Sequence, residues 1–230
     1  MKASTVYNIL QNVITYDVLR TNSKSDESVI RKFLGLDGNH PVHISGGWES
    51  WLQVELINRI HKYYQDSKDS ISFTRENSYP DYRTTEDKLE KYDLALAVKD
   101  KWDFFLELKT QRGKEDSSFW ALHINDLQKA HAIHTDYTKK KYNHTILAAV
   151  VFRAADLEGG LSKVNKSLTE LGYPNKNFNI NIKSEVGGLA FDGKWVSEPL
   201  EKLMINKSWI ENLKSNYLIA AIWTEFSFFS

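Results

Sequence analysis

The chain has 230 residues and no cysteine, is 41% hydrophobic and 26% charged, and carries a formal net charge of zero at pH 7. This length and composition suit a single folded domain with a hydrophobic core. The missing cysteines exclude disulfides and thiolate metal sites. The neutral balance excludes a global basic field for nucleic acid, although a local patch would suffice.

The first part of the chain predicts helices. Apolar residues recur at helical spacing over residues 3–20, 25–36 and 48–64. The beginning of the chain lacks the uninterrupted apolar stretch of a signal peptide. No run approaches the roughly eighteen apolar residues that a membrane span needs. We therefore expect a cytoplasmic protein without membrane segments.

The middle of the chain predicts strands followed by a helix and a further strand. Residues 70–76 alternate between apolar and polar, and residues 92–98 and 103–110 predict an antiparallel hairpin. A helix is expected over residues 116–134. The run at 144–152 is continuously apolar and β-branched, which is typical of a strand buried on both faces.

The last third predicts additional α and β elements. We expect a helix over residues 156–171, strands at 178–184 and 188–196, a helix over 198–214 and a final strand at 216–226. The chain is thus expected to be one α/β domain. Its central part has the order helix, three strands, helix, strand.

Three charged residues lie in or beside apolar strands of that central part. Asp93 precedes one strand, and Glu107 and Lys109 lie in the next. Because strand side chains alternate between faces, Glu107 and Lys109 share a face. A turn near residues 99–101 brings Asp93 opposite the end of their strand. Two carboxylates suit a hard cation such as Mg²⁺, and the ammonium could orient water or stabilise phosphate charge.

Asp93, thirteen intervening residues and then Glu107-Leu-Lys109 resemble the PD-(D/E)xK phosphodiesterase superfamily. Acidic-x-Lys occurs four times in the chain, but only this copy lies in an apolar strand. The resemblance covers residues 47–153 and extends to the element order. It implies a restriction endonuclease-like core with added N-terminal helices and C-terminal α+β elements. The chain departs from the pattern in having Tyr92 instead of proline before Asp93, and Ala132 where a Gln-x-x-x-Tyr signature would have tyrosine.

The resemblance also implies the other site residues. In that family a preceding helix often contributes another acid, for which Glu55 is the natural match and Glu49 the second choice. The later helix often carries a basic or polar residue. That helix offers Asp126, Gln128 and Lys129, of which Lys129 is our choice and Gln128 a further candidate. The basic stretch at 138–144 offers Lys139 and Lys140 as contacts for a phosphate backbone.

The implied activity is phosphodiester hydrolysis with Mg²⁺, or Mn²⁺ as a substitute. The resemblance assigns metal binding to Asp93, Glu107, Glu55 and the Leu108 carbonyl, and water orientation to Lys109. We expect an endodeoxyribonuclease of a restriction or defence type that leaves a 5′-phosphate. DNA is the expected partner, and a homodimer is left open.

Other interpretations of these residues remain open. Glu107 and Lys109 fit a cross-face ion pair, and Asp93 fits an ordinary strand-start acid. Glu55 stands at i,i+4 from Arg59 and fits a helix-surface pair. The alternative function is a non-catalytic binding or inhibitory protein on the same fold. The nuclease hypothesis requires the three residues to converge, with Lys109 outside the core and no arginine neutralising both acids.

Overall fold

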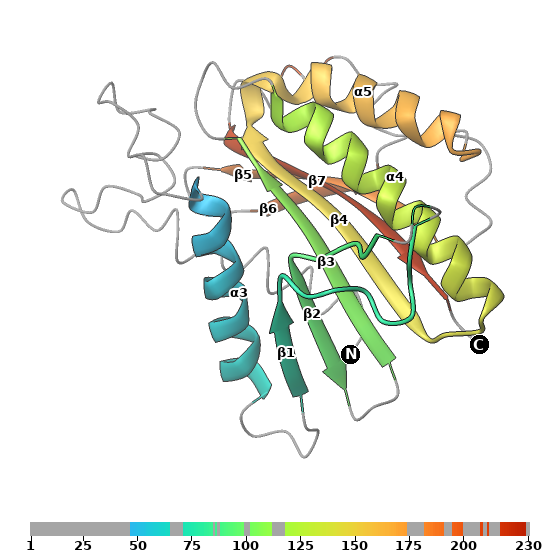
Figure 1. The fold of residues 1–230 in the computed structure, drawn as a ribbon. Helices are drawn as coiled ribbons and strands as arrows, with labels where there is room; N and C mark the ends of the chain where they lie inside the picture. The colour runs from blue at the N-terminus through green and yellow to red at the C-terminus, as the bar shows by residue number, and fades with distance from the viewer. Residues whose placement is uncertain are drawn as a thin grey trace.

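The computed structural model describes a large part of the chain (Figure 1). The described residues are 47–64, 71–84, 86, 88–98, 102–111, 118–173, 182–190, 195–199, 208, 211 and 217–228. The two helices expected within residues 3–36 lie outside these ranges. So does most of the helix expected over 198–214.

The described residues form three α-helices and seven strands, joined in one place by a short 3₁₀ helix. In chain order they are α3 (Gly47–Tyr64), β1 (Ile71–Arg75), β2 (Leu94–Val98), β3 (Trp102–Thr110), α4 (Ser118–Lys139), β4 (His144–Arg153), η2 (Ala154–Asp156), α5 (Leu157–Glu170), β5 (Ile182–Ala190), β6 (Trp195–Pro199) and β7 (Tyr217–Ser227). The expected α/β class is confirmed. The expected order from α3 to β4 is also confirmed.

The strands form one mixed sheet with the order β1-β2-β3-β4-β7-β5-β6. Among the described strands, only β3 and β4 pair in parallel, and α4 is the crossover between them. The expected hairpin is confirmed, because β2 and β3 pair antiparallel with Leu94 opposite Leu106. Strand β4 is buried along almost its whole length, as its continuous apolar sequence predicts.

The C-terminal strands continue past their expected ends, and the expected residues 178–181 and 191–194 lie outside the described ranges. The strands expected at 178–184 and 188–196 are β5 at Ile182–Ala190 and β6 at Trp195–Pro199. The ladder explains the difference, because β5 pairs along its length with β7 and thereby extends through Gly187 and Gly188. Local composition alone favours a break at these glycines.

Helices cover both faces of the sheet. Helices α4 and α5 contact each other, and α4 packs on β3 and β4 (Figure 1). Their side of the core includes Phe105, Tyr137 and Phe152. Helix α3 contacts β3 and β1 instead. Because side chains alternate along β3, Leu106 and Leu108 point away from α4 toward the other face.

The connection between β1 and β2 is folded onto α4. Its two arms are joined by a bridge between Ser78 and Lys91. The Tyr137 hydroxyl of α4 donates to the carbonyl of Pro80 at 2.6 Å, and Lys140 donates to the carbonyl of Asp81 at 2.6 Å. These contacts hold the buried side chain of Tyr79 against the sheet.

Helices α4 and α5 make a close contact at Gly160. A Cβ on Gly160 would lie 2.0 Å from the Trp120 ring, whereas one on neighbouring Gly159 would meet nothing within 4 Å. We predict that Gly160→Ala lowers the free energy of unfolding by about 1–3 kcal/mol through overpacking. Gly159→Ala should raise it by up to about 1 kcal/mol, because alanine favours a helix over glycine. Urea unfolding of both variants checks this, and equal effects would contradict the packing.

Candidate functional site

The candidate site lies where β2 begins and β3 continues past it. The backbone N–H of Asp93 donates to the carbonyl of Leu106 at 3.2 Å. The Asp93 carboxylate then accepts the N–H of Leu108 at 2.6 Å. This side chain thus takes the place of a ladder partner for β3. Asp93 therefore lies beside Glu107, as the hairpin predicts.

Glu107 is the most deeply buried member of the site, with 1% of its surface exposed. Its Oε1 accepts from the Tyr79 hydroxyl at 2.5 Å. Its Oε2 lies 2.8 Å from the Lys129 ammonium. Burial raises the pKa of Glu107 to about 8, the charges of Asp126 and Asp93 add to the rise, and Lys129 opposes it. Glu107 is thus a carboxyl group with both oxygens engaged and little access to solvent.

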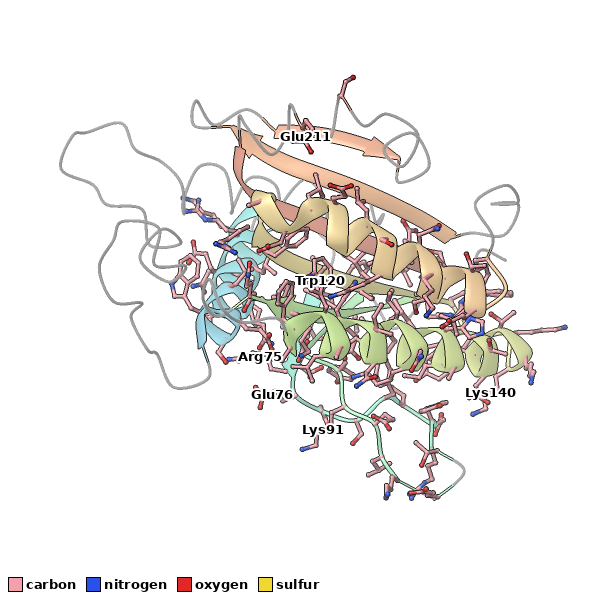
Figure 2. The ribbon with its side chains drawn as sticks, turned by 90° about the horizontal axis from the view of Figure 1, so that it is seen from above. Arg75, Glu76, Lys91, Trp120, Lys140 and Glu211 are labelled. Atoms are coloured by element: carbon pink, nitrogen blue, oxygen red, sulfur yellow. The ribbon has the colours of Figure 1, made fainter. Side chains whose placement is uncertain are left out.

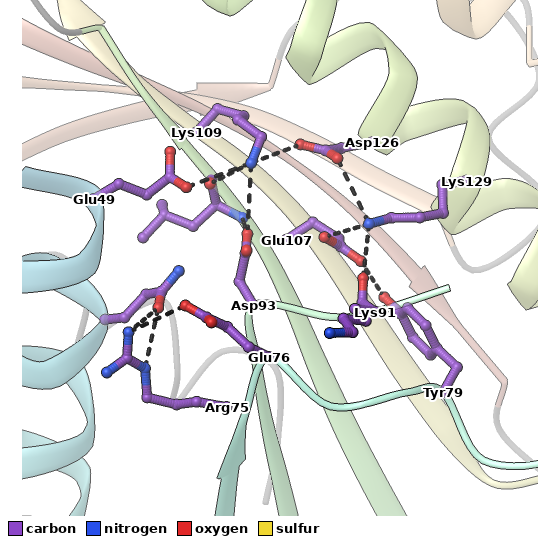
Figure 3. A network of polar contacts seen from close by, with 12 residues as sticks. Glu49, Arg75, Glu76, Tyr79, Lys91, Asp93, Glu107, Lys109, Asp126 and Lys129 are labelled. Atoms are coloured by element: carbon purple, nitrogen blue, oxygen red, sulfur yellow. Dashed lines mark hydrogen bonds and ion pairs between the residues drawn. The ribbon is translucent and has the colours of Figure 1, made fainter. Parts of the chain in front are cut away.

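Lys109 is surrounded by oxygen atoms at the end of β3 (Figure 3). Its Nζ lies 3.3 Å from the Leu108 carbonyl and 3.4 Å from Glu49 Oε1. The carboxylate oxygens of Asp126 and Asp93 lie at 3.7 and 3.9 Å. Burial lowers the pKa of Lys109, but these carboxylates outweigh it and the pKa is raised. Lys109 is therefore an ammonium group that points toward the acids and out of the core.

Helix α4 adds an acid and a base one turn apart. Asp126 Oδ1 lies 3.7 Å from Lys129 Nζ, and Lys129 also donates to the carbonyl of Lys91 at 2.9 Å. Burial raises the pKa of Asp126, and Lys109 and Lys129 oppose the rise. Figure 3 shows the result as one chain of alternating charge, from Glu49 through Lys109, Asp126 and Lys129 to Glu107.

The donor set suits a hard cation. Four carboxyl groups face two ammonium groups, which leaves two formal negative charges in excess when all are ionised; the groups are Glu49, Asp93, Glu107, Asp126, Lys109 and Lys129. One divalent cation would balance these two negative charges, and oxygen ligands are those that Mg²⁺ prefers. Within the described residues, no three His, Asp or Glu side chains converge on a common cation position. The two lysines lie between the acids instead.

The structure does not bring every predicted residue to this site. Glu55 Oε1 accepts from Arg59 at 3.0 Å, which is the helix-surface pair left open above. Glu49, the second choice, reaches Lys109 because it lies in the first turn of α3. Gln128 is exposed on α4. Positions 49 and 55 are six residues apart, so their side chains point about 120° away from each other around the helix axis. They therefore cannot both face the site.

The predicted phosphate contacts lie at the other end of α4. Lys139 is exposed, and Lys140 pairs with Asp136 at 2.7 Å and with the carbonyl of Asp81. Figure 2 shows Lys140 at the end of α4 opposite Trp120. These two lysines are therefore separate from the carboxyl cluster.

Tyr79 was not predicted to belong to the cluster, and Asp126 was offered by the later helix but not chosen. Asp126 and Lys129 lie on the same face of α4 because they are three residues apart. This spacing is visible in the sequence. Tyr79 lies in the β1–β2 connection, and its position depends on contacts between that connection and α4. The same stretch holds Asp81, an acid that is not expected at the site because it lies in a loop well before the hairpin.

No family model, curated protein or solved structure matches this chain. Among the described helices, none combines the length and the apolar character that crossing a membrane requires.

The pKa of Glu107 predicts how stability varies with pH. A carboxyl group whose pKa is raised from 4.5 to about 8 holds its proton in the folded state and releases it in the unfolded chain between these values. The free energy of unfolding should therefore fall as pH rises from 4.5 to about 8 and level off above that pH. In metal-free protein, Glu107→Gln should flatten the slope between pH 6.5 and 8. Urea unfolding at several pH values tests this, and an unchanged slope would contradict it.

Proposed function

We propose that this protein is a metal-dependent phosphodiesterase, and that it acts as a DNA endonuclease. One observation carries the proposal: Asp93, Glu107 and Lys109 meet where β2 begins and β3 continues. Arg75, which Figure 3 shows near the cluster, is engaged by Gln53 at 2.7 Å and by Glu76 at 3.6 Å. Arg75 therefore neutralises neither Asp93 nor Glu107 (Figure 3).

The fold around the site supports a restriction endonuclease-like core. Helix α3 precedes three consecutive strands that pair antiparallel, and α4 then leads to β4, parallel to β3. Asp93 directly precedes β2 and Glu107 lies in β3, while α3 contributes one charged side chain to the cluster and α4 contributes two. A fold alone does not establish an activity. The proposal therefore depends on the side chains.

The residues divide into groups that would hold a cation and groups that would act on the phosphate. Asp93, Glu107 and the Leu108 carbonyl would hold Mg²⁺, which supplies stabilisation of charge on the phosphate oxygens. Lys109 touches the Leu108 carbonyl and would orient water beside it. Lys129, 19% exposed, would turn from Glu107 to a phosphate oxygen. In-line displacement would leave a 5′-phosphate.

The first test is Mg²⁺-dependent cleavage of linear, circular and single-stranded DNA. We predict that Glu107→Ala and Lys109→Ala each reduce the rate by at least about 100-fold, because Glu107 would hold the Mg²⁺ and Lys109 would orient the water. Glu170→Ala and Lys166→Ala are matched controls, since these residues form an exposed pair on α5. Equal cleavage by all four variants would refute the assigned centre.

The second test uses two glutamates of the same helix. We predict that Glu49→Gln lowers the single-turnover rate about tenfold, because the acceptor that fixes the direction of Lys109 loses its negative charge. Glu55→Gln should leave the rate within twofold, because it removes only a surface pair with Arg59. If Glu55→Gln lowers the rate more than Glu49→Gln does, Glu55 belongs to the site in place of Glu49.

A non-catalytic binding protein on the same fold is the second candidate. The observation that favours it is the engagement of both Glu107 oxygens by Tyr79 and Lys129. If that arrangement is permanent, the site has no place for a cation. Calorimetric titration of Mg²⁺ and Mn²⁺ into the natural chain and into Asp93→Ala distinguishes the two. Binding that Asp93→Ala abolishes supports the phosphodiesterase, and absence of binding to both supports the alternative.

A further inference from the structure

Asp126 lies in the charged cluster without a direct hydrogen bond for one of its oxygens. Its Oδ2 has no hydrogen-bond partner in the part of the chain that the structure describes, although the residue is only 7% exposed. Lys109 Nζ is 3.7 Å from this oxygen. A separation of 3.7 Å exceeds that of a hydrogen bond and is one that an offset water can bridge.

His123, one turn earlier on the same helix, also lacks hydrogen-bond partners. It is fully buried, and neither ring nitrogen has a hydrogen-bond partner among the described residues. The charge of Lys109 acts on this imidazole, as it does on Asp126. Leaving a buried polar group unpaired is energetically costly, so such groups usually have a partner. Asp126 and His123, two such groups one turn apart on α4, thus indicate a polar ligand small enough for an interior position.

Lys109 has one donor left for such a ligand. An ammonium carries three N–H groups. Two of them have acceptors within hydrogen-bond distance, the Leu108 carbonyl and Glu49. The third remains for a group between Lys109 and Asp126. A water there would accept from Lys109 and donate to Asp126 Oδ2, which leaves its second lone pair directed away from the ammonium.

We propose that Asp126 is a further catalytic residue, which binds the attacking water together with Lys109 and accepts its proton. His123 is a positioning residue that keeps this pocket polar. The proposal rests on the proposed phosphodiesterase function. The water oxygen bonds to phosphorus and the bond from phosphorus to the leaving sugar oxygen breaks. The water proton passes to Asp126 Oδ2, and the leaving oxygen takes a proton from solvent.

The kinetic test compares two aspartates of α4. Asp126→Asn should lower kcat by about 100-fold or more and leave KM and the Mg²⁺ Kd within threefold, because the amide cannot take the proton. Asp136→Asn is the matched control, since Asp136 pairs with Lys140 outside the site. His123→Asn should lower kcat less than Asp126→Asn does. A kcat for Asp126→Asn within threefold of the natural chain would overturn the proposal.

A structural test does not depend on activity. A high-resolution crystal structure of the natural chain should hold an ordered water within hydrogen-bond distance of both Lys109 Nζ and Asp126 Oδ2. A direct Lys109–Asp126 hydrogen bond with no water would overturn the proposal, even if the protein cleaves DNA. If the natural chain cleaves nothing, the proposed function fails and the catalytic role of Asp126 fails with it. An ordered water in an inactive protein would then support only the binding pocket.

Discussion

The burial of the Glu107 carboxylate is the constraint around which this part of the molecule is arranged. An acid that is 1% exposed has to be hydrogen-bonded or neutralised. Its partners come from two separate segments, Tyr79 from the β1–β2 connection and Lys129 from α4. Lys129 also donates to the carbonyl of Lys91, so the connection, the helix and β3 meet at one ammonium. The position of one charge thus joins three elements distant in sequence.

Short-range rules account for the part of the site that lies on the hairpin. Alternation along β3 places Glu107 and Lys109 on one face, and the turn length places Asp93 beside them. These rules work because strand geometry leaves few alternatives. Predicting the place of Glu49 requires the angle at which α3 meets the sheet. Predicting the place of Tyr79 requires knowing how an irregular segment docks onto α4. Both are tertiary packing outcomes that sequence spacing does not encode.

The fold was predictable to a similar extent. Helices and strands from α3 to β4 follow from apolar periodicity, and the final strand is β7 as expected. The order of strands beyond β4 was not predictable from the chain order. Strand β7 is the last described strand in the chain, but it lies in the sheet between β4 and β5. Burial explains this placement. Strand β4 has no polar face, and only strands on both sides can pair its backbone fully.

The insertion of β7 has a consequence for biosynthesis. The ribosome completes β4 well before β7, since residues 154–216 separate them. At about 5–20 residues per second, the edge of β4 waits several seconds for its partner. An apolar edge strand without a partner invites pairing with other chains. Helices α4 and α5 can cover one face of the nascent sheet in that time, so the unpaired β4 edge is the segment that a chaperone would have to protect.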